Sequence, residues 1–462
     1  MKKAWERELE IIQNAVPCYM QDDNEIFWEE QSSAPEQAQD HLTGIHYHSQ
    51  VPGSRAVESI VTAAIQATEN KGMVVDGGLE LLEKGLKAYE EQDFVNMHRY
   101  EQAVYNACYA ARKDENSPYW QQTFYDSFEA YEKKVSLPRY EVDIASKTDA
   151  FYGGWLAQII GGAYGTCIEG YTGRAIKEKY NGELNKYVRK PNTYNDDTTY
   201  ELALLLAYKE HGKDTTAADI AAEWVARIPN GWSAEEWALD RLKAGIMPPE
   251  SGRFHNPFNE WIGAQMRGAI CGQLYPGDLR EAARCAWMDA TISHDRNGIL
   301  GEVFNALLVS MSFVEKDVRK VLKACIELIP EDSEYGSVIR FAYAQCLKFD
   351  HYNDAWLACE KKYDHYNWVH AYPNACAEVV ALYYGNGDFE KTITYCGGCG
   401  QDVDCNAAQI MTVLGTMNGS ASIPAYWSDP FGDELISYVR GFKKTTITAL
   451  AKLTQEVALS LR

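Results

Sequence analysis

Apolar residues recur along most of this 462-residue chain at the three- and four-residue spacing that is typical of amphipathic helices. The run from Val318 to Ile329 shows the pattern clearly, with its apolar residues on one face until Pro330 interrupts it. Segments in which apolar and polar residues alternate, as they do in a half-buried strand, are scarce. The pattern therefore predicts an all-α protein.

The first 145 residues have a different pattern from the rest of the chain. Residues 20–57 are polar and mixed, with Pro, Gly and Ser among them, so we expect mostly loops there. Residues 79–135 have the periodicity of two or three amphipathic helices. Pro138 disfavours helix in the residue before it and suggests a joint between two regions. We predict a smaller, mostly helical N-terminal extension over residues 1–145 and a helical domain over residues 146–462.

Charge is distributed unevenly between these two regions. The formal net charge is −22, and residues 1–145 carry 26 Asp or Glu against 13 Lys or Arg. An acidic chain without a run of Lys and Arg is repelled by phosphate backbones and by anionic lipid head groups. We therefore expect no nucleic-acid partner. The acidic extension could contact a basic protein partner, or it could simply support the main domain.

The sequence offers no feature that would place the chain in a membrane or an oxidising compartment. Residues 1–8 contain several charges, so we do not expect them to begin a signal peptide. No stretch of 18 apolar residues occurs that could form a transmembrane helix. The 12 cysteines are scattered among apolar residues, as reduced and buried cysteines are. We expect a cytoplasmic protein.

Two pairs of aspartates stand where helices are predicted to begin. Asp196 and Asp197 directly precede an apolar run, and Asp402 and Asp404 follow a glycine-rich turn. Acidic residues at a helix start can satisfy free backbone N–H groups and the helix dipole, so helix capping explains either pair taken alone. Adjacent carboxylates also suit hard cations, and oxygen ligands favour Mg²⁺, Mn²⁺ or Ca²⁺ over zinc.

A glutamate, a histidine and three cysteines are further candidates for a functional site. Glu169 follows small residues at helical spacing, which would let two helices pack closely, and it could equally be a solvated residue at a helix end. His294 stands in a polar loop, where a lone histidine is more often structural than catalytic. A rival hypothesis takes Cys396, Cys399 and Cys405 as zinc ligands. Zinc sites usually have a second C-x2–4-C pair, and none lies nearby in the sequence.

Four segments, taken together and in this order, resemble the ADP-ribosylglycohydrolase family. They are a Gly-rich segment that ends in Glu169, an Asp-Asp-Thr at a helix start, a Ser-His loop and a late Gly-x-Asp-x-Asp. The similarity runs from about Tyr152 to about Trp427, and residues 259–268 also fit one subgroup of the family. The resemblance implies an orthogonally packed, all-helical domain with two divalent ions, Mg²⁺ or Mn²⁺, at the floor of a cleft.

The resemblance also implies roles for individual residues. The implied metal ligands are Asn195, Asp196, Asp197, Asp402, Asp404 and Cys405. The family usually has Thr or Ser in place of Asn195 and Thr in place of Cys405; an amide oxygen can replace a hydroxyl, but sulfur is a poor ligand for Mg²⁺. The implied catalytic residues are Glu169, Asp196, Asp197 and Asp402, with Glu169 as the acid or base. The implied substrate contacts are His294, Asn297, Gly398 and Gly400.

The reaction that this resemblance implies is cleavage at the anomeric carbon of a ribose through an oxocarbenium-like state. Bound metal ions could hold the ribose hydroxyls and lower the pKa of a water molecule. The leading hypothesis is a metal-dependent hydrolase that cleaves an N- or O-ribosyl bond and removes ADP-ribose from a modified protein side chain. Two alternatives remain open: an N-glycosidase of a small ribosyl compound, and a binding protein that neutralises an ADP-ribosyltransferase and has a weakened metal site.

Overall fold

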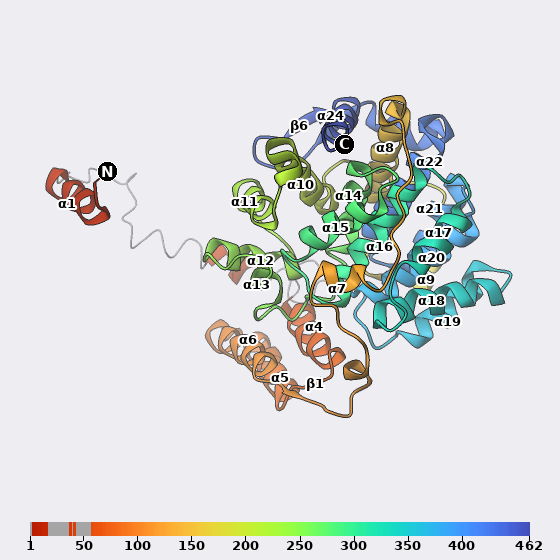
Figure 1. Cartoon of the computed structure of the whole chain (residues 1–462). Helices are drawn as coiled ribbons and strands as arrows, with labels where there is room; N and C mark the ends of the chain where they lie inside the picture. The colour runs from red at the N-terminus through yellow and green to blue at the C-terminus, as the bar shows by residue number, and fades with distance from the viewer. Residues whose placement is uncertain (1, 17–36, 39, 43–56) are drawn as a thin grey trace.

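Helices make up nearly all of the regular structure in the computed structural model, as the sequence predicts (Figure 1). The structure describes residues 2–16, 37–38, 40–42 and 57–462. Most of the stretch predicted to be loop-rich, residues 20–57, therefore lies outside the described residues. In the part of the chain that is described, no helix combines the length and the apolar character needed to cross a membrane.

The helices fall into an N-terminal group and a larger C-terminal group. The first group is α1 (Ala4–Asn14), α4 (Val57–Asn70), α5 (Gly78–Glu90), α6 (Phe94–Tyr109) and α7 (Phe128–Glu132). The second group is α8 (Thr148–Gly165), α9 (Gly173–Lys179), α10 (Asp196–His211), α11 (Ala217–Arg227), α12 (Ser233–Lys243), α13 (Glu250–Arg253), α14 (Gly268–Leu274), α15 (Leu279–Ala290), α16 (Asn297–Ser312), α17 (Val318–Glu327), α18 (Glu334–Lys348), α19 (Tyr352–Lys362), α20 (Ala371–Gly385), α21 (Phe389–Cys399), α22 (Val403–Asn418), α23 (Ala425–Ser428) and α24 (Ile447–Ser460).

Short elements connect these helices. The 3-10 helices are η1 (Pro118–Gln121), η2 (Ile144–Ser146), η3 (Gly212–Asp214), η4 (Gln265–Arg267), η5 (Ser420–Ser422) and η6 (Asp429–Phe431). The strands form antiparallel pairs, which are β1 (Met73–Val74) with β2 (Arg112–Lys113), β3 (Tyr171–Thr172) with β4 (Gly400–Gln401), and β5 (Glu434–Ile436) with β6 (Lys444–Thr446).

Helices α8 and α22 pack backbone against backbone. A Cβ atom added at Gly161 would lie 2.4 Å from the carbonyl oxygen of Ala407, and one added at Gly165 would lie 2.1 Å from the backbone nitrogen of Asp404. These positions accept only glycine because the two helices touch there. The small residues that the sequence shows at helical spacing thus set how closely the end of α8 approaches the start of α22.

The N-terminal region contacts the C-terminal helices at several points. Tyr125, Phe128 and Tyr131 are buried in the main hydrophobic core. Helix α4 packs its alanines against Phe258 and Trp261 in a second, smaller core cluster. Helix α1, by contrast, buries none of its residues. Residues 57–145 therefore pack on the domain that follows them.

Candidate active site and metal centre

Three segments that lie far apart in the sequence bring the predicted carboxylates to one cavity of about 610 Å³. Glu169 follows the end of α8, Asp196 is the first residue of α10, and Asp402 and Asp404 lie at the start of α22. Strands β3 and β4 hold the first and third segments together, and the Gly170 N–H donates to the carbonyl oxygen of Gln401 at 2.8 Å. The cavity wall therefore gathers both aspartate segments and Glu169.

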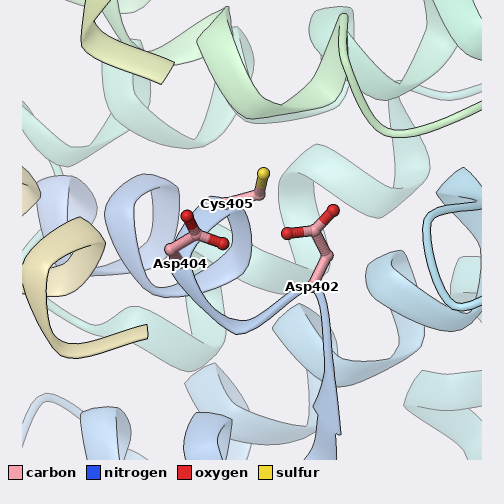
Figure 2. Close-up of side chains that lie close together, drawn as sticks. All are labelled: Asp402, Asp404 and Cys405. Carbon is pink, nitrogen blue, oxygen red and sulfur yellow. The ribbon is translucent and has the colours of Figure 1, made fainter. Parts of the chain in front are cut away.

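Asp402, Asp404 and Cys405 form a compact group at this cavity (Figure 2). One ligand atom from each residue lies within 4.8 Å of the others, and all three side chains are buried. The Oδ1 atoms of Asp402 and Asp404 are buried without a hydrogen-bond partner, and so is Oδ2 of Asp197. A buried carboxylate oxygen without a donor is costly, because neither water nor protein offsets its charge. The carboxylate oxygens of this group fit a hard divalent cation, whereas the Cys405 sulfur does not.

Burial, followed by repulsion among neighbouring carboxylates, determines the electrostatics of the group. Burial, and then the charge of Asp404, raises the pKa of Asp196 to about 7. Burial and neighbouring carboxylates also raise the pKa values of Asp197, Asp402 and Glu169 well above their ordinary range. Carboxylates this close together cannot all hold a charge at low cost unless a cation lies between them.

Asn195 and Cys405, the two residues that depart from the family pattern, both make hydrogen bonds within the group. The Asn195 side-chain oxygen accepts from the backbone N–H of Asp197 at 2.9 Å and caps α10, while its Nδ2 donates to Asp404 at 3.3 Å. The Cys405 thiol donates to Oδ1 of Asp197 at 3.2 Å. Both residues orient aspartates in this arrangement. The ligand roles predicted for them stay predictions.

His294 does not reach the cavity, in contrast to the substrate contact expected for it. The side chain is buried, Nδ1 lies 2.7 Å from the Ser293 hydroxyl oxygen, and Nε2 accepts from the Ala264 N–H at 3.3 Å. Burial, and then the charge of Arg267, lowers its pKa well below the usual value, so the ring stays neutral. With both ring nitrogens occupied in the interior, His294 positions the protein backbone.

The other three expected substrate contacts also lie outside the cavity wall. Asn297 donates to Gln122 at 3.0 Å and to Glu260 at 3.1 Å, and so ties the N-terminal region to the domain. Gly398 and Gly400 serve close packing: a Cβ at Gly398 would lie 2.6 Å from the Tyr352 hydroxyl, and Gly400 has φ +75° within β4. None of the three is among the described residues that line the cavity, and their substrate contacts stay predictions.

Sequence reasoning missed Glu235, which lines the cavity from the first turn of α12. Its Oε1 accepts from Nη1 of Arg267 at 3.0 Å. Burial raises the pKa of Glu235 to about 7, and the guanidinium limits that rise. A Cβ at Gly263 would occupy the position of the Glu235 carboxylate, so this glycine makes room for it. The acidic first turn of α12 resembles ordinary helix capping, so the sequence does not indicate that Glu235 lines a cavity.

The rival zinc hypothesis finds no support in the described residues. The group there that could hold a metal consists of Asp402, Asp404 and Cys405, and Cys396 and Cys399 are not part of it. Burial raises the pKa values of both of these thiols well above the usual range, which opposes the thiolate form that zinc requires.

The family of this chain follows from its similarity to known proteins. The model of the ADP-ribosylglycohydrolase family matches residues 143–460. The chain belongs to this family. Its all-α fold agrees with that membership, as the sequence predicted, and membership supports a glycohydrolase of ADP-ribose linkages. Residues 1–142 lie outside the match.

A solved structure of an ADP-ribosylglycohydrolase-related protein complex is similar to this family member. The two are 17% identical, with a TM-score of 0.46, and the similarity covers 69% of this chain and 98% of that chain. No curated protein matches the chain by sequence.

Proposed function

We propose that this family member is a divalent-metal-dependent hydrolase that cleaves an N- or O-ribosyl bond, with an ADP-ribosylated protein side chain as the preferred substrate. The observation that carries the proposal is the set of buried, unpartnered carboxylate oxygens of Asp402 and Asp404 at the cavity and of Asp197, which is hydrogen-bonded to Cys405 on the cavity wall. Helix capping alone would not leave these oxygens buried without donors.

The aspartates of both pairs would hold two ions, Mg²⁺ or Mn²⁺, because these hard cations prefer oxygen ligands. When bound, such ions hold ribose hydroxyls and lower the pKa of a coordinated water. The chain itself orients the carboxylates. The Asp402 N–H donates to the Asn374 side-chain oxygen at 3.1 Å, and the Cys405 thiol donates to Asp197. The first contact positions the backbone of Asp402, and the second orients the carboxylate of Asp197.

Glu169 is the residue that we assign to acid or base catalysis. It lines the cavity from the turn after α8, and its side chain is less buried than those of Asp402 and Asp404. It is therefore better placed than those aspartates to exchange a proton with a substrate. Cleavage of a ribosyl bond needs one group that gives a proton to the leaving atom or takes one from water. We expect Glu169→Gln to lower kcat far more than it raises KM.

The test is release of ADP-ribose from arginine- and serine-modified proteins in the presence of Mg²⁺ or Mn²⁺, with and without a chelator. Asp402→Asn should abolish release, and the chelator should do the same to the wild-type protein. Asp388→Asn is the matched control, because Asp388 caps α21 at the protein surface by accepting from the Lys391 N–H. Release that persists unchanged with the chelator and in Asp402→Asn would contradict the proposal.

Two other outcomes would identify the alternative functions. Release only from small ribosyl compounds, and from no modified protein, would favour a small-molecule N-glycosidase. An absence of both metal binding and hydrolysis would favour a binding protein that captures an ADP-ribosyltransferase. The acidic extension supports that second alternative only through its charge.

A further inference from the structure

Part of the candidate active-site cavity is built by helices that the family match does not cover. Ile60 and Val61 of α4, and Glu101 and Tyr105 of α6, line the same cavity as Glu169 and the aspartates. These residues precede position 143, where the family match begins. The extension therefore takes part in the wall of the site.

Packing against the domain holds this part of the wall in place. Ala63, Ala64 and Ala67 of α4 are buried against Phe258 and Trp261. The Tyr105 ring lies 5.1 Å, centroid to centroid, from the Trp237 ring, with an angle of 50° between the two planes. The ring of Trp237 in turn lies 5.8 Å from that of Phe258. An unbroken row of rings thus joins the extension to the domain along one side of the cavity.

The wall has a distinct chemistry. Its aromatic residues are Tyr105, Tyr194, Trp232, Trp237, Phe258, Trp261, Trp368 and Tyr438. Its acidic residues are Glu101, Glu169, Asp196, Glu235, Glu236, Asp402 and Asp404. None of the described residues that line the cavity is Lys, Arg or His. Rings and carboxylate acceptors suit a planar group that carries N–H donors, such as a nucleobase.

Basic side chains line a different cavity, on the other side of the Tyr105–Trp237 pair. This second cavity has a volume of about 780 Å³, and Lys71, Arg241 and Arg253 lie on its wall. Glu101, Tyr105 and Trp237 line both cavities and so lie between them. The basic side chains of the second cavity are not among the described residues that line the first.

We propose that α4 and α6 are part of the substrate-binding site, where Tyr105 packs against the base of a nucleotide-type substrate and Glu101 accepts a hydrogen bond from that base. Glu101 lies one turn before Tyr105 on α6, so both side chains face the cavity together. Oε2 of Glu101 already lies 3.0 Å from Nδ1 of His98, so the oxygen offered to the base is Oε1. The proposal deepens the proposed function, because it names what the part of the cavity outside the family match recognises. Base–aromatic packing of this kind tolerates different bases, while the carboxylate adds preference for one with an amino group.

Binding measured without turnover tests this inference independently of hydrolysis. The probes are adenosine, ADP-ribose and ribose 5-phosphate. Calorimetry measures their binding to the full-length protein in the presence of Mg²⁺. Tyr105→Ala should lower the affinity for adenosine and ADP-ribose by about tenfold or more, and the affinity for ribose 5-phosphate by less than about twofold. Tyr105→Phe keeps the ring and should bind all three as the wild-type protein does. Glu101→Gln should also lower the affinity for adenosine, but by less than Tyr105→Ala lowers it.

The matched control is Tyr100→Ala on the same helix, since Tyr100 is also half-buried but packs toward α5 and does not line the cavity. It should leave all three affinities unchanged, and thermal melting checks that every variant is folded. With any substrate that is hydrolysed, Tyr105→Ala should raise KM and leave kcat within about twofold.

Equal adenosine affinity in folded Tyr105→Ala and wild-type protein would overturn the inference, as would tight binding of ribose 5-phosphate together with no binding of adenosine. If adenosine binds through Tyr105 but no ribosyl bond is cleaved, the proposed hydrolase function fails and the inference about the extension stands.

Discussion

The Cys405 thiol donates a hydrogen bond to the Asp197 carboxylate, with 3.2 Å between Sγ and Oδ1. This contact joins the two aspartate segments, since Cys405 lies in α22 and Asp197 in α10. Burial, and then the charge of Asp197, raises the pKa of Cys405 well above its ordinary value, so that the sulfur keeps its proton. Cys405 thus acts as a donor that orients Asp197 and leaves Oδ2 of that carboxylate free of protein partners.

The first prediction separates the donor role of Cys405 from a ligand role. Cys405→Ser keeps a donor to Asp197 and places a hard oxygen at the site, so we expect Mg²⁺ to bind at least as tightly as in the wild-type protein. Cys405→Ala removes the donor, and loss of such a supporting contact typically weakens metal binding by about 10- to 100-fold. Calorimetric titration with Mg²⁺ measures both. Equal weakening in the two variants would contradict the donor role.

The second prediction concerns the sign of the effect of Asp402→Asn on stability. Without metal, this change replaces a carboxyl group whose ionised form is disfavoured, since burial and then Asp404 raise the pKa of Asp402 well above normal. We therefore expect a higher melting temperature than that of the metal-free wild-type protein at pH 7. With Mg²⁺ at 100 times its Kd, the wild-type protein gains about 2.7 kcal/mol from binding, and the variant gains little.

Thermal melts of both proteins with and without Mg²⁺ test this reversal. The order of melting temperatures should invert on adding the metal. If Asp402→Asn is the less stable protein under both conditions, the repulsion among the carboxylates does not limit stability.

The third prediction tests the close contact between α8 and α22. A methyl group at Gly165 would lie 2.1 Å from the Asp404 nitrogen, which is backbone and cannot turn aside. We expect Gly165→Ala to lower the free energy of unfolding by about 3 kcal/mol and to weaken metal binding, because it must push the start of α22 away. Denaturant unfolding measures the first effect.

Gly85→Ala in α5 is the control for Gly165→Ala. A Cβ at Gly85 has Tyr100 Cβ as its nearest neighbour, at an ordinary contact distance of 3.5 Å. Alanine is also the better helix former, so Gly85→Ala should leave stability unchanged or raise it by about 1 kcal/mol. Similar losses in the two variants would show that glycine is not specifically required at Gly165.

The sequence reveals the helix starts that carry the aspartates, but it does not reveal the surroundings of the expected substrate contacts, and the reason is physical. Asp196 and Asp402 stand at helix starts that local pattern reveals, and the family resemblance placed both pairs in one site. His294 and Asn297 lie in or beside a loop whose sequence does not show which way each side chain turns. Their partners, such as Glu260, come from segments that are distant in sequence.

The wall formed by the extension could not be predicted for the same reason. Glu101 and Tyr105 belong to an amphipathic helix, and its periodicity shows that one face is covered but not what covers it. Tyr105 meets Trp237 only because α4 packs on Phe258 and Trp261. The division into an extension over residues 1–145 and a following domain stays a prediction, and the contribution of the extension to the cavity depends on tertiary contacts that composition does not show.

The last prediction uses a buried carboxyl group outside the cavity. Burial raises the pKa of Glu201 to about 8, although Gln158 and Gln409 donate to it at 2.6 Å and 3.2 Å. A carboxyl whose pKa is higher in the folded state than in the unfolded state favours folding when protonated. The favourable contribution is complete below the ordinary pKa of 4.5 and is lost progressively as the pH rises to about 8.

Glu201→Gln is uncharged at every pH, so the variant should gain stability relative to the wild-type protein by roughly 1.4 kcal/mol per pH unit between pH 5 and pH 8. The amide can be accommodated because the unpartnered Oε1 of Gln158 can accept from it once that side chain turns over. Urea unfolding at pH 5 and pH 8 gives the difference. Glu210→Gln, at an exposed position of the same helix, should show no such pH-dependent gain. A gain for Glu201→Gln that is the same at both pH values would mean that Glu201 does not hold its proton in the folded protein.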